Sequence, residues 1–283
     1  MVIVGSGAVQ PCMAGCEPIC AEIAKVEMFQ EEAELAGAVY QPFGERNVAG
    51  YTEVTDPDEL AKLDLTVEDL NPEDSEFRAG VFKKNGTNDY KVSFKGTESG
   101  ADWVQNFSQG TTSRSDYYSR AKLIGRDAAS NAGTGEVGDV KFVGHSLGGG
   151  LASAAAHASG THATTFNSAG LHWANRSWFD APPIDAVQVK GELLTSVQSA
   201  LPVAPSGVGT PYSIAPPTNV ASTLERADLG IWDGLIPIKG AYKYTKAAAA
   251  RAVELHKMPA VNGALEQQHG ALKAKAAASG CSC

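Results

Sequence analysis

The chain has 283 residues, of which 43% are hydrophobic and 19% charged, and its formal net charge is −9. This composition is typical of a globular protein with a sizeable core, and it excludes the fibrous and disordered classes. The acidic balance argues against a general nucleic-acid binder and against simple electrostatic attachment to an anionic membrane. No apolar run approaches the roughly 20 residues that are needed to span a bilayer.

The N-terminus is apolar and rich in small residues as far as Gln10, and the first positive charge is Lys25. A secretory signal peptide normally begins with a basic region, so we expect no cleaved leader. The sequence therefore predicts either secretion by a route without a cleaved leader or a cytoplasmic location.

The five cysteines lie at the two ends of the chain. Their four-residue spacing near the N-terminus would align three thiols on one helical face, but Pro11 and Pro18 interrupt that helix, and no nearby histidine completes a zinc site. A disulfide that joins the two ends is an alternative, and it would leave an odd thiol. The sequence favours free, solvent-facing thiols at Cys12, Cys16, Cys20, Cys281 and Cys283.

Hydrophobic periodicity predicts strands that alternate with helices. The expected helices span 19–39, 102–107, 115–131, 148–159, 247–256 and 259–278. The expected strands span 77–83, 89–95, 140–143, 161–166 and 186–189, with a short one near Tyr212. Residues 41–78 and 201–240 read as turn-rich loops, and residues 271–283 as a frayed tail.

This alternation predicts a mainly parallel sheet with crossover helices. We expect an α/β fold in one domain over residues 1–283, with residues 1–76 as a helical and loop extension packed on it. A hairpin turn is expected at Lys84-Asn85-Gly86.

A G-x-S-x-G motif at 144–148 carries the chemistry. A short apolar strand leads into it and a helix of small residues leads out, which is the layout of a nucleophile elbow. Side chains at Gly144 and Gly148 would collide with neighbouring backbone, so both positions must be minimal. The alternative is a glycine-rich packing turn with a spectator serine. We expect Ser146 to be the nucleophile.

The serine needs a base and an acid, which follow it in chain order in this kind of fold. His256 ends a predicted helix and is the favoured base, whereas His269 lies in a polar run and reads as surface. Glu192 follows a late strand and is the favoured acid, although it could equally be an ordinary helix-start acid. The competing carboxylates are Asp180, Asp185 and Asp233.

An oxyanion intermediate needs two hydrogen-bond donors. One is the backbone N–H of Leu147, directly after the serine, and the other is expected after an early strand, at Thr97. The alternative for the Thr97 segment is an ordinary strand-end turn.

Several motifs together resemble the class 3 lipase family of α/β-hydrolases. They are Phe94-Lys95-Gly96-Thr97, Asp102-Trp103, Gly144-His145-Ser146-Leu147-Gly148-Gly149 and Thr165-Phe166-Asn167. The segments around Glu192 and His256 resemble a bacterial subgroup of lipase-like secreted effectors. Lys95 replaces the family's usual Arg, and Glu192 its usual Asp. The family often carries a lid helix, for which 102–109 is the candidate, with a packing helix as the alternative.

The resemblance implies an α/β-hydrolase fold and a Ser146–His256–Glu192 triad with oxyanion donors at Thr97 and Leu147. It implies no cofactor and no catalytic metal. The implied activity is phospholipase A-type hydrolysis of membrane phospholipid by an antibacterial effector toxin, with an immunity protein and a secretion-machine component as partners. Two other functions stay open: an esterase or lipase for small or neutral esters, and a catalytically dead binding protein.

Overall fold

The computed structural model describes residues 15–96, 116–177, 180–194, 207–227 and 237–283. Seven strands form one sheet in the order β1-β2-β3-β4-β5-β6-β7. The first two pairings are antiparallel and the other four are parallel. The strands are β1 (Tyr51–Glu53), β2 (Ala79–Lys84), β3 (Tyr90–Phe94), β4 (Val140–His145), β5 (Ala163–Phe166), β6 (Ile184–Val189) and β7 (Thr210–Ile214). This is the expected mainly parallel α/β sheet.

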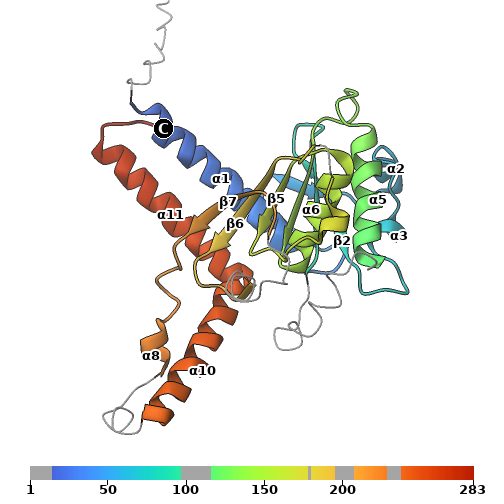
Figure 1. Cartoon of the computed structure of the whole chain (residues 1–283). Helices are drawn as coiled ribbons and strands as arrows, with labels where there is room; N and C mark the ends of the chain where they lie inside the picture. The colour runs from blue at the N-terminus through green and yellow to red at the C-terminus, as the bar shows by residue number, and fades with distance from the viewer. Residues whose placement is uncertain (1–14, 97–115, 178–179, 195–206, 228–236) are drawn as a thin grey trace, which may run out of the picture.

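Helices flank the sheet (Figure 1). The long helices are α1 (Glu17–Ala38), α5 (Asp116–Ser130), α6 (Leu147–Ser159), α10 (Pro237–His256) and α11 (Met258–Ala278). The short ones are α2 (Pro57–Ala61), α3 (Val67–Leu70), the 3₁₀ turn η1 (Trp173–Asn175) and α8 (Thr223–Ala227). Among the described residues, no helix is both long enough and apolar enough to cross a bilayer.

The alternation of side chains along β3 explains the two layers of helices. Val92 and Phe94 join the large apolar core that includes residues of α5 and α6. At the alternate positions, Lys91 pairs with Glu32 of α1, and Ser93 donates to the carbonyl of Leu35 on the same helix. Successive strand residues point to opposite faces of a sheet, so α1 lies on the face opposite α6.

The N-terminal segment contributes to the sheet itself. Its strand β1 pairs with β2, and Leu35 of α1 packs with Phe82 and Val143. Strand β1 was not predicted, because three residues are too few to establish an alternating pattern. The expected helix at 102–107, which includes Trp103, lies outside the described residues.

The preference for free cysteines was wrong. Cys16 is bonded to Cys281 and Cys20 to Cys283, while Cys12 lies outside the described residues. Pro18 does not interrupt the helix, because it occupies the first turn of α1, where a missing N–H breaks no helical hydrogen bond.

The expected frayed tail was also wrong. Helix α11 continues to Ala278, and it packs along α1 (Figure 1). The two disulfides join the start of α1 to the residues that follow α11. The two ends of the described chain are therefore covalently tied together.

Candidate active site

Ser146 lies at a sharp turn between β4 and α6. Its backbone has φ +58° and ψ −125°, a conformation that L-residues rarely adopt. Its N–H donates to the carbonyl of Phe166, and its carbonyl accepts from the N–H of Ala169. A Cβ at Gly148 would lie 2.0 Å from the carbonyl oxygen of Phe94, so this position of the elbow admits only glycine.

His256 is the last residue of α10, and its ring faces the serine. Its Nε2 is 2.9 Å from the Oγ of Ser146, and its Nδ1 is 2.7 Å from an Oε of Glu192. Because a carboxylate only accepts, Nδ1 carries the proton and Nε2 accepts from the serine hydroxyl. This is the tautomer that a general base needs.

Glu192 follows β6 after a turn at Gly191, whose φ is +80°. It is fully buried, and the oxygen that meets His256 also accepts from the N–H of Leu194 at 2.8 Å. The turn is closed by the N–H of Glu192, which donates to the carbonyl of Val189. The structure thus brings Ser146, His256 and Glu192 into one hydrogen-bonded chain.

The competing candidates lie elsewhere. His269 contacts Glu27 at 2.8 Å, and Asp185 is paired with Lys25 and His162. Asp180 is exposed, and Asp233 lies outside the described residues.

Of the two expected oxyanion donors, the structure describes only Leu147. Leu147 is the first residue of α6, and the N–H groups of a helix's first turn have no partner within the helix. Its N–H therefore lies beside the serine and points out of the helix start. Thr97 lies outside the described residues.

Asn167 is a further residue of the site, and sequence analysis assigned it only a place in a motif. Its amide nitrogen donates to the carbonyls of Leu255 and His256, each at 3.0 Å, and its Oδ1 accepts from the N–H of Val189 at 2.9 Å. It is fully buried. Asn167 thereby connects the ends of β5, β6 and α10.

No metal site accompanies these residues: across the part of the chain that the structure describes, no three His, Cys, Asp or Glu side chains converge as ligands would.

Burial lowers the pKa of His145 to about 3, with a smaller contribution from the neighbouring His256, so this ring is neutral at physiological pH.

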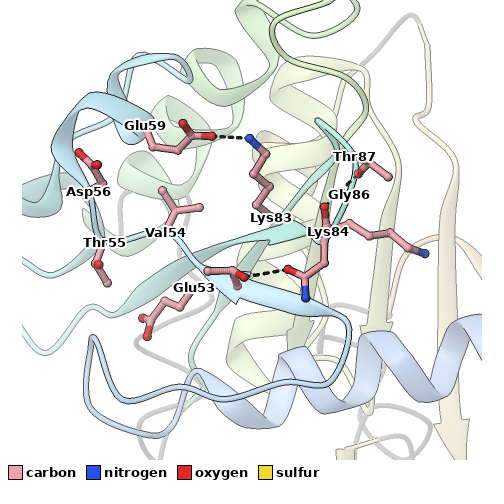
Figure 2. A pocket seen from close by; sticks show the side chains of 11 residues that line it. Glu53, Val54, Thr55, Asp56, Glu59, Lys83, Lys84, Gly86 and Thr87 are labelled. Carbon is pink, nitrogen blue, oxygen red and sulfur yellow. Dashed lines mark hydrogen bonds and ion pairs between the residues drawn. The ribbon is translucent and has the colours of Figure 1, made fainter.

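A groove of about 460 Å³ lies over β1 and β2, and Figure 2 shows the residues that line it. The groove includes the β2–β3 hairpin, which leads into the start of β3 at Tyr90. Tyr90 pairs with Val140, the first residue of β4, whereas the elbow follows the last residue of β4. The groove therefore lies at the other end of β4 from the elbow. Within the groove, Glu59 accepts a hydrogen bond from Lys83 at 2.7 Å. Hydrogen bonds from Lys62, Lys83 and Tyr90 lower the pKa of Glu59 to about 2.

A mainly parallel sheet with a strained serine at a strand-to-helix turn defines the class of α/β-hydrolases. The sequence model of a family described as "Phospholipase-like: Tle-like phospholipase domain" matches residues 31–221. The chain belongs to this family, which confirms the resemblance to lipase-like and phospholipase-like hydrolases and the predicted class of carboxylic ester hydrolase.

Individual proteins that the chain resembles are a phospholipase and lipases. The chain is 32% identical over 194 residues to an extracellular phospholipase A1 of Serratia liquefaciens, a match that covers 65% of this chain and 58% of the relative. Among solved structures, a lipase from Rhizopus microsporus var. chinensis matches with a TM-score of 0.49 and 14% identity, over 75% of this chain and 85% of that one. A triacylglycerol lipase from Penicillium expansum matches with a TM-score of 0.46 and 16% identity, over 68% and 80%.

Proposed function

We propose that this chain is a phospholipase A-type enzyme that uses Ser146, His256 and Glu192 as its catalytic triad. The serine Oγ attacks the ester carbonyl carbon while His256 Nε2 takes its proton. His256 then protonates the departing lysophospholipid oxygen, which leaves an acyl-serine. Water attacks the acyl-serine with His256 again as base, and the fatty acid is released.

The observation that carries this proposal is the hydrogen-bonded chain from Ser146 through His256 to Glu192, with 2.9 Å and 2.7 Å between the paired atoms. The buried carboxylate stabilises the imidazolium that forms during attack. The N–H of Leu147 is one donor to the oxyanion, and Thr97 is proposed as the other.

Phospholipid is the proposed substrate because of the chain's family and its Serratia relative, a phospholipase A1. That relative is extracellular, so secretion is proposed for this chain as well. Action as an antibacterial effector, with an immunity protein and a secretion-machine partner, extends this proposal and comes from the resemblance alone.

The test uses vesicles of phosphatidylethanolamine and phosphatidylglycerol with a different acyl chain at each position. Mass spectrometry should find one lysophospholipid and one fatty acid in equal amounts, and the acyl chain released identifies the position attacked. Ser146→Ala and His256→Ala should each lower turnover at least roughly 10⁴-fold, and Glu192→Gln should cost less.

The outcomes separate the alternatives. Hydrolysis of soluble short-chain esters without lysophospholipid would indicate an esterase instead. A folded protein that no fluorophosphonate probe labels would indicate a binding protein without activity. Turnover by Ser146→Ala equal to that of the wild type would overturn the assignment of the nucleophile.

A further inference from the structure

The hydroxyl of Tyr40 meets two parts of the active site. Tyr40 follows α1, and its OH is 3.1 Å from Nδ1 of His145 and 3.1 Å from the N–H of Gly96. His145 directly precedes the proposed nucleophile, and Gly96 directly precedes Thr97, the proposed oxyanion donor. One side chain from the N-terminal segment therefore contacts both the elbow and the loop after β3.

The hydrogen bonds in this group have only one consistent direction. Nε2 of His145 is 2.7 Å from the carbonyl oxygen of His256, which can only accept, so Nε2 carries the proton. Nδ1 of the neutral ring must then accept, and the Tyr40 hydroxyl donates to it. That hydroxyl in turn accepts from the N–H of Gly96. The chain runs from Gly96 through Tyr40 and His145 to His256.

The end of this chain is the main chain of the proposed general base. The carbonyl of His256 accepts from both His145 and Asn167, so both of its lone pairs are used. Helix α10 ends here, because Lys257 has an extended backbone. At this junction between α10 and α11, the two side-chain donors fix the main-chain carbonyl of His256.

The space around the Tyr40 hydroxyl is closely filled. A Cβ at Gly96 would lie 2.4 Å from that hydroxyl and 2.6 Å from the carbonyl oxygen of His145. The ring of Tyr40 also lies 6.2 Å from that of His145, centroid to centroid. A shift of the Tyr40 ring would therefore move His145 as well.

We propose that Tyr40 is a positioning residue for the hydrolysis: its hydroxyl holds the His145 ring, and the His145 ring holds the backbone of His256 so that Nε2 stays in line with Ser146. This inference rests on the proposed function. Tyr40 acts here through His145, whose Nδ1 lies 3.1 Å from its hydroxyl.

The test is Tyr40→Phe, which removes one oxygen and keeps the ring. A misplaced catalytic group lowers the chemical rate more than substrate binding, so kcat should fall about tenfold with KM within twofold of the wild type. The rate of labelling by a fluorophosphonate probe should fall by a similar factor, because it reports the reactivity of Ser146 without substrate.

Tyr212→Phe is the matched control. It removes a hydroxyl that donates to Glu22 of α1, outside the site, and should leave kcat and labelling unchanged. A melting temperature for Tyr40→Phe close to that of Tyr212→Phe separates positioning from general destabilisation. A Tyr40→Phe enzyme with kcat and labelling within twofold of the wild type would overturn the proposal.

A double-mutant cycle with His145→Asn tests the route. If Tyr40 acts through His145, Tyr40→Phe should cost less than threefold in the His145→Asn background, because the ring that it aligns is gone. Equal costs in both backgrounds would sink the inference. Failure of the proposed function would look different, since the wild-type chain itself would then release no fatty acid and resist the probe.

Discussion

Asn167 donates from its amide nitrogen to the main-chain carbonyl of His256 over 3.0 Å, while the ring of the same histidine lies 2.9 Å from the Oγ of Ser146. Its own backbone has φ +43°, which is unusual for a residue with a side chain. A buried residue in such a conformation needs surroundings that fix it. Here the N–H of Val189 and the carbonyl of Leu255 supply them.

Asn167→Asp should destabilise the protein by about 2–4 kcal/mol, because a carboxylate oxygen would replace the donor and face two carbonyl oxygens without water. Denaturant unfolding measures the change. The matched control is Asn175→Asp, also buried, where Oδ1 accepts from Lys122 at 3.0 Å. A new charge beside that ammonium should cost less than about 1 kcal/mol. Equal costs for the two variants would contradict this account of Asn167.

Gly148→Ala should disrupt the elbow. The new methyl group would lie 2.0 Å from the carbonyl oxygen of Phe94 and 3.0 Å from the carbonyl carbon of Lys95, which are backbone atoms that cannot rotate away. Overpacking of this kind costs about 3 kcal/mol. Since the elbow itself must shift, probe labelling of Ser146 should also be lost in the fraction that folds.

Gly37→Ala provides the contrast within one protein. Gly37 lies in α1 with nothing within 4 Å of an added Cβ, so alanine should stabilise the helix by up to about 1 kcal/mol. The two substitutions are chemically identical and should shift the melting temperature in opposite directions. A loss of stability at Gly37 would show that its surroundings are tighter than described.

Stability should fall in mild acid because of His145. Burial lowers its folded-state pKa to about 3 from an ordinary value of 6.5. Between these two values the unfolded chain binds a proton that the folded chain does not. The contribution of neutral His145 to the free energy of unfolding is therefore fully present above pH 6.5. It is lost as the pH falls towards 3, by at most about 1.4 kcal/mol per pH unit for one group.

The His145→Asn variant isolates this contribution. Between pH 6.5 and 5, its free energy of unfolding should decline less steeply with falling pH than that of the wild type. The difference in slope should correspond to the uptake of up to one proton on unfolding. Burial also lowers the pKa of His157, so some slope should remain in the variant. Identical slopes for the two proteins would mean that His145 is protonated within the folded state.

Sequence reasoning was most successful where a local pattern has one physical solution. Two β-rich segments around a hairpin signal identified β2 and β3, and helical spacing identified α5. A strand, glycines and a serine identified the elbow. Strand β1 was not predicted, because its three residues form a strand only through their pairing with β2. The single-domain organisation stays a prediction.

The partners in the site could be found only as far as chain order reaches. His256 and Glu192 follow the serine at the ends of predicted elements, and the segments around them also resemble those of lipase-like effectors. Tyr40 carried no comparable sign, because its contact with His145 spans 105 residues and depends on how α1 packs on the sheet. The cysteine pairing likewise depends on α1 and α11 lying side by side, which periodicity does not report.

The two disulfides should share one stabilising effect rather than add. The first bond closes a separation of 265 residues, which in the chain-entropy model is worth about 5 kcal/mol. With that loop closed, the second bond restricts only the few residues between them. Removal of either pair, by Cys16→Ser with Cys281→Ser or by Cys20→Ser with Cys283→Ser, should therefore cost about 1–2 kcal/mol. Removal of both pairs should cost about 6–7 kcal/mol, because the long loop is then no longer closed, and denaturant unfolding without reductant measures it. If the cost of removing both equals the sum of the two separate costs, each bond stabilises the native helices directly, and the shared loop-closure account fails.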